Sequence, residues 1–405
     1  MSETLVSSPP ATLSREVVQR LSRSRREPAW LLDVRLRALE AFQRLSLPDQ
    51  RTEGWRRTSL RGLELDASQP WAAEVDLQVS GDTRAVVVPI EDAVRDTPLA
   101  SVVERHFGQV VAPDVDKFVA FHYAFFNAGA VIVVPRGVVL EEPLWLRYTT
   151  DGPVLAHTLV ILEDEAYLSA LVEEFRGGRE VASNVVEQVV GANAHLRYVQ
   201  LGEYATDVWN FSTQRATLAQ DASLRTLNAA RGARTTRSAV QVVLEGRGSQ
   251  ADLLGIVDVG GRQHVDFQTL QEHYGDATRS DLVIHDALRD RASANFTGLI
   301  RINKSAHQTE SSQEQKNILL SDAAKADSDP KLEILNNDVI RCTHGAAVGP
   351  VDSEMVFYLQ SRGLDRASAE QLIVDGFFQS TLARLDLPSL EERIWSVISE
   401  ERTRQ

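Results

Sequence analysis

A short pattern recurs at a fixed spacing along the middle of the chain, and this repeat limits the possible folds more than any other feature. The segments LEDEAYL, VGANAHL and LAQDASL share an apolar–x–x–x–Ala–x–Leu pattern. The central alanine of each segment lies 28 residues from the next: Ala166, Ala194 and Ala222. Weaker echoes continue the series at Ser249, Ala277 and Ala306. A fixed period of this size without intervening helix is typical of a solenoid, in which each unit buries its face on the next.

The residues around this repeat have the properties of strands. Eleven of the 14 prolines lie at or before Pro153, and the next one is Pro330. Because proline removes a donor from the ladder of hydrogen bonds, so long a proline-free stretch suits continuous sheet. The sequence therefore predicts a mainly β protein with a right-handed parallel β-helix core over residues 129–349. A β-sandwich of short strands is the structural alternative.

The region before this core, residues 1–128, is predicted to be mostly helical with short strands. After Pro28, apolar residues recur at helical spacing, and Arg35 lies on the opposite, polar face. A second helix in the segment DKFVAFHYAFFNAG is expected to end at Asn127–Gly129 with a left-handed cap.

The region after the core, residues 350–405, is also predicted to be helical. Asp352 and Asp365 stand where they can cap two helices. The second helix has an apolar band, wider than one narrow stripe, that consists of Leu372, Ile373, Val374, Phe377, Phe378 and Leu382. We expect these helices to cover the open edge of the solenoid and to dock a partner.

Composition excludes several classes of function. The formal net charge of −14 argues against nucleic acid or an anionic membrane as the main partner. No apolar run approaches the roughly 20 residues that a membrane helix needs. Because Cys342 is the single cysteine, a disulfide within the chain is impossible, which suits the reducing cytosol. The expected location is the cytoplasm.

No signature of an enzyme stands out, and one short element suggests a metal site instead. The chain has neither a P-loop nor a nucleophile elbow nor an H-E-x-x-H motif. In Arg341-Cys342-Thr343-His344, the thiol and the imidazole are two residues apart and would project from one face of a strand. Sulfur and nitrogen donors suit iron or zinc. The alternative is a small buried thiol beside a hydrogen-bonded histidine. Four other histidines near predicted strands have no tight metal spacing: His264, His273, His285 and His307.

The C-terminal third resembles a known family. The run NNDVIRCTHGAAVGPVDSEMVFYLQSRGLDRASAEQLIVDGFFQ is similar to the signature of the SufB/SufD family of iron–sulfur cluster assembly proteins. The segments REPAWLLDVRLRALEAF and GWRRTSLRGLELD resemble the start of SufD-type members. SufB-type members carry a sulfur-accepting cysteine upstream of the C-x-H element, where this chain has Gln315 and Lys316 in SSQEQKNILLSD. The resemblance is therefore closest to SufD.

This resemblance implies a fold and a set of partners. It implies a parallel β-helix between helical ends, a SufB partner that pairs through the β-helix edges, and the ATPase SufC bound to the C-terminal helices. Cys342 and His344 match residues that lie at the SufB–SufD contact, where they would help to hold iron or a transient iron–sulfur cluster. The implied role is that of a non-catalytic scaffold subunit. Two alternatives are a homodimeric scaffold of the same family that acts alone and a β-helix carbohydrate-active enzyme, which needs paired carboxylates and aromatic residues in a groove.

Overall fold

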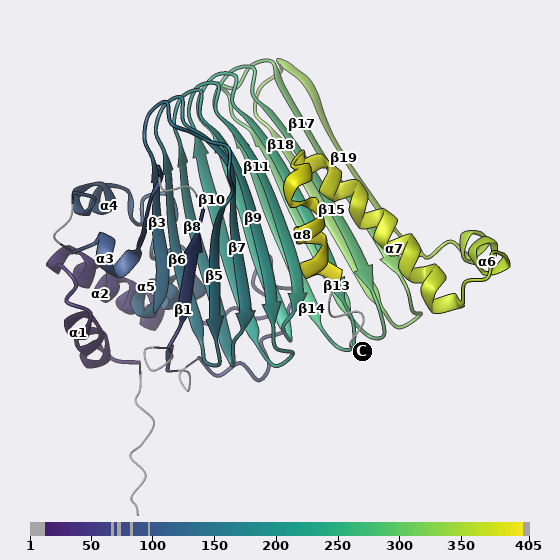
Figure 1. Cartoon of the computed structure of the whole chain (residues 1–405), viewed down its shortest axis with the longest axis horizontal. Helices are drawn as coiled ribbons and strands as arrows, with labels where there is room; N and C mark the ends of the chain where they lie inside the picture. Colours follow the sequence, from purple (N-terminus) through teal and green to yellow (C-terminus); the bar gives the residue numbers. More distant parts are fainter. Residues whose placement is uncertain (1–12, 66–68, 71–73, 82–83, 96–97, 400–405) are drawn as a thin grey trace, which may run out of the picture.

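The computed structural model describes residues 13–65, 69–70, 74–81, 84–95 and 98–399. Its centre is a β-solenoid of about eight coils, in which each coil contributes one strand to each of two facing sheets (Figure 1). Within the described residues, sheet A runs in the order β1 (Asp76–Ser80), β5 (Leu144–Thr150), β7 (Tyr167–Gly177), β9 (His195–Tyr204), β11 (Ser223–Gly232), β13 (Gln250–Val259), β15 (Arg279–Leu288), β17 (Thr309–Leu319) and β19 (Val339–Pro350), with β4 (Val139–Leu140) beside β7. Sheet B runs in the order β18 (Lys325–Ile334), β16 (Ser293–Ile302), β14 (His264–His273), β12 (Thr235–Leu244), β10 (Trp209–Leu218), β8 (Val181–Val190), β6 (Val154–Leu162), β3 (Ala128–Val134) and β2 (Val86–Pro89).

Strand pairing confirms the expected parallel β-helix. Each strand from β3 to β19 pairs in parallel with the strand one coil away; for example, Phe211 lies between Ser183 and Arg237. In the described ranges, only β1 and β2 pair antiparallel, each against the first coil of its sheet. Two packed antiparallel sheets would have shown the opposite pattern, so the β-sandwich alternative is wrong.

The repeated alanines stack at equivalent corners, as their spacing predicts. The backbone N–H of the residue after each corner donates to the alanine one coil earlier: His195 to Ala166, Ser223 to Ala194, and Gln250 to Ala222, each at 2.9 Å. All three alanines are buried at the point where the chain turns into the next strand. A larger side chain there would meet the neighbouring coils, which explains the small residue in each unit.

The weaker echoes of the repeat are only partly correct. Ser249 occupies the corner position, because its carbonyl accepts from the N–H of Arg279 at 3.0 Å. In the next two coils the corner residues are Thr278 and Thr309, not Ala277 and Ala306. The last coils are longer than 28 residues, so a constant spacing drifts out of register with the strands.

The N-terminal helices lie at one end of the solenoid and pack on the outer face of sheet B over β3, β6, β8 and β10 (Figure 1). They are α1 (Arg15–Ser24), α2 (Ala29–Arg44), α3 (Ile90–Ala93), α4 (Ala100–His106) and α5 (Lys117–Phe125). The placement of Arg35 on an exposed face is wrong, because this side chain is completely buried. It forms an ion pair with Glu27 at 2.7 Å and donates to the carbonyl oxygen of Ala124 at 3.1 Å. Because α2 packs against both α1 and α5, its second face is also covered.

The end of α5 differs from the expected left-handed cap. The helix stops at Phe125, and Phe126 leads in an extended conformation towards β3. Gly129 does have a positive φ of 152°, but it lies inside β3. A Cβ atom there would collide with the carbonyl oxygen of His157 in the neighbouring strand. Glycine is therefore needed for close packing of two strands, and it does not end the helix.

The C-terminal helices are α6 (Ser353–Ser361), α7 (Arg366–Leu382), the 3₁₀ turn η3 (Ala383–Leu385) and α8 (Pro388–Ser399). Asp352 and Asp365 cap α6 and α7 as predicted, by accepting from backbone N–H groups of the first turns. The expectation that these helices close the open edge of the solenoid is wrong. Val374, Phe378 and Leu382 of α7 pack on the outer face of sheet A, and α6 projects beyond β19 (Figure 1). No helix among the described residues is long and apolar enough to cross a membrane.

Candidate functional site at the open end of the solenoid

Cys342 and His344 lie on β19, the last strand of sheet A. In the parallel register, Cys342 lies beside Ser311 and His344 lies beside Gln313, two buried residues that face the lumen. The two candidate side chains therefore share the lumen-facing side of β19. Cys342 is half-buried against the cluster of Ile300, Ile302 and Ala306, and this burial raises the pKa of its thiol. His344 is exposed.

The exposure of His344 results from its place at the end of the stack. Within the described ranges, β18 and β19 pair on one side only, so the lumen-facing residues of the last coil are uncovered. Pro330 lies in β18, where its missing N–H breaks no ladder because the strand is at the edge. Several large apolar side chains are exposed at this end: Ile334, Leu335, Ile340 and Val348. We call this surface the open end.

The donor set of the open end is incomplete for a cluster. In the described part of the chain, no group of three or more His, Cys, Asp or Glu side chains is arranged to hold a metal ion. Cys342 and His344 supply one sulfur and one nitrogen donor, whereas an iron–sulfur cluster is usually held by four ligands. Two donors are fewer than the usual ligand set of such a cluster.

The other candidate histidines have structural partners. His273 is buried and bonded to Thr278 and Ser280, and burial lowers its pKa to about 4. His285 is buried beneath α7 and stacks on Phe377. His264 bonds to Thr58 and Ser293, and His307 lies 3.5 Å from Asp338. None of the four lies on β19.

A buried histidine pair lies elsewhere in the fold, and the sequence reasoning missed it. His122 of α5 and His157 of β6 approach within 3.3 Å, and His157 lies 3.1 Å from Glu187 of β8. Burial lowers the pKa of His122 well below its ordinary value. Glu187 also accepts from the N–H groups of Gly108, Val110 and Val111. The network thus ties the segment after α4 to sheet B. Its members come from four segments without common spacing, so no sequence pattern marks it.

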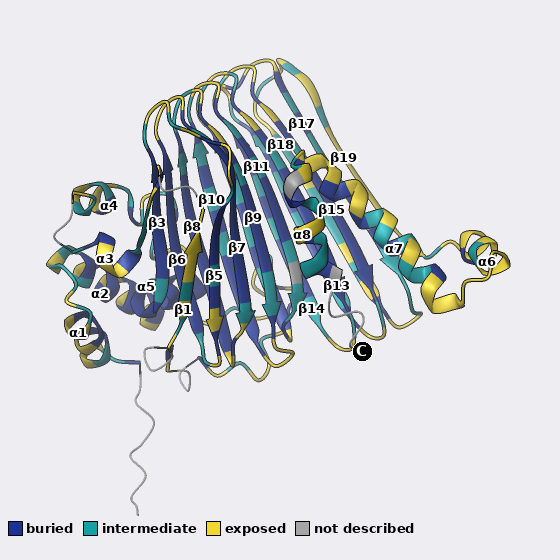
Figure 2. Ribbon diagram, in the orientation of Figure 1, coloured by how far each residue is buried: buried dark blue, intermediate teal, exposed yellow. Residues whose placement is uncertain are grey.

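A second exposed surface lies on the C-terminal helices. The predicted band on α7 is divided as expected: Val374, Phe378 and Leu382 are buried, whereas Leu372 is 51% exposed. The expected docking region, residues 350–405, also includes α6, on which Phe357 is 72% exposed. Figure 2 shows α6 as mostly exposed. The exposed apolar side chains, which we call the α6–α7 patch, are Met355, Phe357, Tyr358, Leu364 and Leu372.

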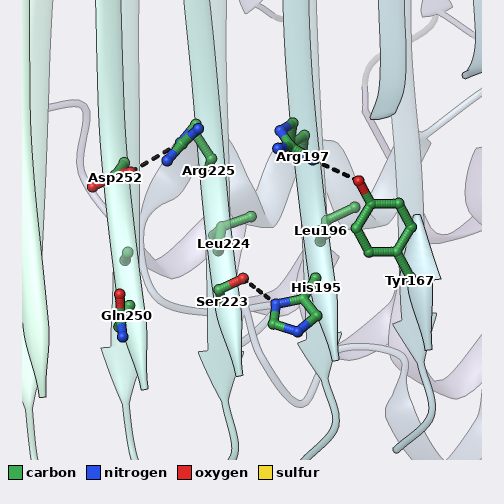
Figure 3. A pocket seen from close by; sticks show the side chains of 10 residues that line it. Tyr167, His195, Leu196, Arg197, Ser223, Leu224, Arg225, Gln250 and Asp252 are labelled. Carbon is green, nitrogen blue, oxygen red and sulfur yellow. Dashed lines mark hydrogen bonds and ion pairs between the residues drawn. The ribbon is translucent and has the colours of Figure 1, made fainter. Parts of the chain in front are cut away.

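A groove on the outer face of sheet A bears on the carbohydrate-enzyme alternative (Figure 3). It has a volume of about 200 Å³ and is lined mainly by polar side chains of β7, β9, β11 and β13. Among its described lining residues, Asp252 is the only carboxylate and is held by Arg225 at 2.9 Å; Tyr167 is the only phenol and bonds to Arg197 at 3.0 Å. Both arginines also donate to the carbonyl oxygen of Leu385. The groove as described lacks the paired carboxylates of a glycosidase. Its two arginines bind the C-terminal segment through the carbonyl oxygen of Leu385.

Sequence comparison relates the chain to known proteins. A sequence profile described as "SUF system FeS cluster assembly, SufBD core domain" matches residues 147–377, which is more than half of the chain and includes the C-x-H element and α6. The chain belongs to the SufB/SufD family. It is 31% identical to an iron–sulfur cluster assembly SufBD family protein of Mycobacterium bovis over 71% of this chain and 74% of that protein.

Similarity does not separate the two branches of the SufB/SufD family. The chain is 26% identical to the iron–sulfur cluster assembly protein SufB of Bacillus subtilis over 91% of this chain and 88% of that protein. It is also 26% identical to SufD of the same organism, over 96% of this chain and 97% of that protein. These similarities give the chain the family-level role, iron–sulfur cluster assembly in the SUF system.

Proposed function

We propose that this chain is a SufD-type scaffold subunit that works in the cytoplasm with SufB and the ATPase SufC and has no catalytic activity of its own. The observation that carries the proposal is the position of Cys342 and His344, side by side on the uncovered edge strand of the β-helix. A site of two donors at such an edge is suited to sharing a cargo with a chain that pairs there. The cargo is iron or a nascent iron–sulfur cluster.

The assignment to the SufD branch rests on β17. Position 315, in the stretch where SufB-type members carry the sulfur-accepting cysteine, is a buried glutamine here, and its amide donates to Asp286 at 2.7 Å. A glutamine cannot accept sulfur. The acceptance of sulfur therefore falls to SufB, and this chain contributes ligands.

The Cys342 thiol must lose its proton before its sulfur can bind iron. Because burial raises the pKa of the Cys342 thiol, the free chain holds this group protonated at neutral pH. A metal must displace that proton to bind the sulfur, so capture of iron releases a proton from Sγ. Partial burial also shields the thiol from oxidants until the partner arrives.

We assign the α6–α7 patch to SufC. An exposed apolar surface of this kind marks an interaction site. The buried half of α7 lies on β13 and β15, and β15 pairs with β17, which in turn pairs with β19. A movement of α7 driven by ATP hydrolysis in SufC would therefore reach the open end through two strands.

Replacement of His344 by Ala tests the site. His344→Ala should leave folding and SufC binding intact, because the side chain is exposed, and should reduce cluster formation in the complex. The measurement is the iron and sulfide content of the complex reconstituted anaerobically. An unchanged cluster yield would remove the metal role of His344, and a chain that fails to fold would make it a structural histidine.

A homodimer that uses the same open end is the second candidate within the family. It is favoured by the exposed apolar residues there, which two copies could cover. Anaerobic co-purification with SufB and SufC, followed by mass measurement, separates the two. A chain that stays with its own copy in the presence of SufB would contradict the heterodimer.

A further inference from the structure

The strand beneath Cys342 and His344 has an unusual inner face. Five successive lumen-facing residues of β17 are polar and buried: Thr309, Ser311, Gln313, Gln315 and Asn317. Only Leu319, at the end of the strand, adds an apolar side chain on this side. Two coils earlier, the corresponding strand β13 fills the lumen with apolar side chains such as Leu253, Val257 and Val259. In sheet A the change from apolar to polar occurs directly below the open end. The candidate site therefore stands on a polar floor on this side, formed by the lumen-facing residues of β17.

Most of this floor is satisfied by hydrogen bonds within the chain. Ser311 shares a hydrogen bond with Ser280 at 2.7 Å, and Gln315 donates to Asp286 at 2.7 Å. Gln313 is the exception. Its Oε1 is buried without a hydrogen-bond partner, and its Nε2 makes a single contact of 3.5 Å, to the carbonyl oxygen of Lys331. A buried acceptor without a hydrogen bond lowers stability, so Oε1 of Gln313 would gain from a nearby donor.

The position of Gln313 places a possible donor beside it. Gln313 lies directly beside His344 in the parallel register, on the same lumen-facing side. A histidine that binds a metal through one ring nitrogen usually donates the N–H of its other nitrogen to a nearby acceptor, which fixes the tautomer and the plane of the ring. We propose that Gln313 is the positioning residue of His344: its Oε1 accepts the N–H of the imidazole when the other ring nitrogen binds iron. This inference rests on the function proposed above.

The amide of Gln313 is held weakly in its position. The amide of Gln313 lies over Gly298 of β16, where any Cβ atom would collide with Oε1. The glycine gives the amide room to lie across the lumen, and the long contact to Lys331 holds it only weakly. A turn of the amide towards His344, as the proposal requires, would break only this one weak hydrogen bond.

Co²⁺ binding to the anaerobic complex of the chain with the partners proposed above tests the inference. Co²⁺ is a spectroscopic probe for Fe²⁺, and its absorption bands report both the thiolate ligand and the coordination geometry. Gln313→Leu should weaken Co²⁺ binding by roughly 10- to 100-fold, the usual effect of removing an outer partner of a metal-binding histidine. Gln313→Glu keeps the acceptor and should restore binding to near the wild-type affinity.

Gln315→Leu is the matched control. It removes a buried glutamine from the same strand, but Gln315 lies beside Ala346, which offers no ligand. This variant should bind Co²⁺ normally and lose stability, because Asp286 loses its donor. Gln313→Leu should show the reverse, weaker binding with a thermal midpoint no lower than that of the wild type. Gln313→Met, with its flexible side chain, is measured in parallel and read in the same way if the leucine variant does not fold.

The role of Gln313 and the metal site itself can be refuted separately. If Gln313→Leu and Gln313→Met bind Co²⁺ like the wild type while His344→Ala loses binding, the role of Gln313 is refuted and the proposed site stands. Failure of Gln313→Glu to restore binding would also refute it. If neither Cys342→Ser nor His344→Ala changes Co²⁺ binding, the proposed function itself is wrong.

Discussion

Truncation of Phe357 to Ala gives a direct test of the docking surface. Phe357 is 72% exposed on α6, a helix on which Val356 is the only fully buried residue. Since the side chain contributes little to the packing of the free chain, Phe357→Ala should leave the thermal midpoint nearly unchanged. Its effect should appear only when SufC is present.

The size of the effect can be worked out from the exposed fraction. Complete burial of a phenylalanine side chain stabilises by about 1.5–3 kcal/mol, and 72% of this side chain is still available for burial by a partner. Its loss should therefore cost about 1–2 kcal/mol of binding free energy. Because about 1.4 kcal/mol corresponds to a factor of ten, the Kd for SufC should rise roughly five- to thirty-fold.

Isothermal titration of purified SufC into the wild-type and variant chains measures this change. Ile340→Ala is a suitable control, because Ile340 is similarly exposed, at 65%, but lies at the open end and not on α6. It should leave the Kd for SufC unchanged. Equal effects of the two substitutions, or a Kd for Phe357→Ala within twofold of the wild type, would refute the assignment of the α6–α7 patch.

Three further predictions concern the stability of the scaffold. Glu27→Gln leaves the buried Arg35 without its counter-charge and should destabilise the fold by about 3–5 kcal/mol in chemical denaturation; a loss below about 1 kcal/mol would contradict the buried ion pair. Burial raises the pKa of Asp286 to about 7, so the folded chain holds a proton that the unfolded chain releases near pH 4. The free energy of unfolding should therefore fall as the pH rises from about 4 to 7 and level off above that. Asp286→Asn should reduce the difference between the free energies of urea unfolding measured at pH 5 and pH 8. An unaltered difference would mean that Asp286 is not protonated in the folded chain. Ala194→Leu should overfill a buried corner and lower stability by about 1–3 kcal/mol, whereas a neutral effect would show that the stacked corners are loose.

The coil architecture could be predicted from the sequence because the corners impose a local requirement. Ala166, Ala194 and Ala222 each need a small residue at the same point of the chain, so the requirement appears as a period. The prediction lost register at Ala277 and Ala306, where longer coils shift the corner to threonine. A periodic sequence pattern can therefore predict the corner residues only of coils that have the same length.

The errors at individual side chains have a different physical origin. Helical spacing placed Arg35 on a solvent face, but it cannot show that a second helix covers that face and supplies carbonyl acceptors. The pair His122 and His157 became neighbours only through packing of α5 on sheet B. Likewise, the C-terminal helices looked suited to close the solenoid, and their true place depends on the apolar outer face of β13 and β15. Long-range packing decided all three.

The two ends of the β-helix differ in a way that limits how far copies of this chain can polymerise. At the N-terminal end the outermost strands are the short antiparallel β1 and β2, of five and four residues, and β2 ends in Pro89. Short edge strands and proline are the usual protection against added strands. At the other end β18 and β19 offer ten and twelve residues for pairing. A particle with a single adhesive end can join one neighbour and then stops growing, so contact through this end gives a closed pair and not a fibril.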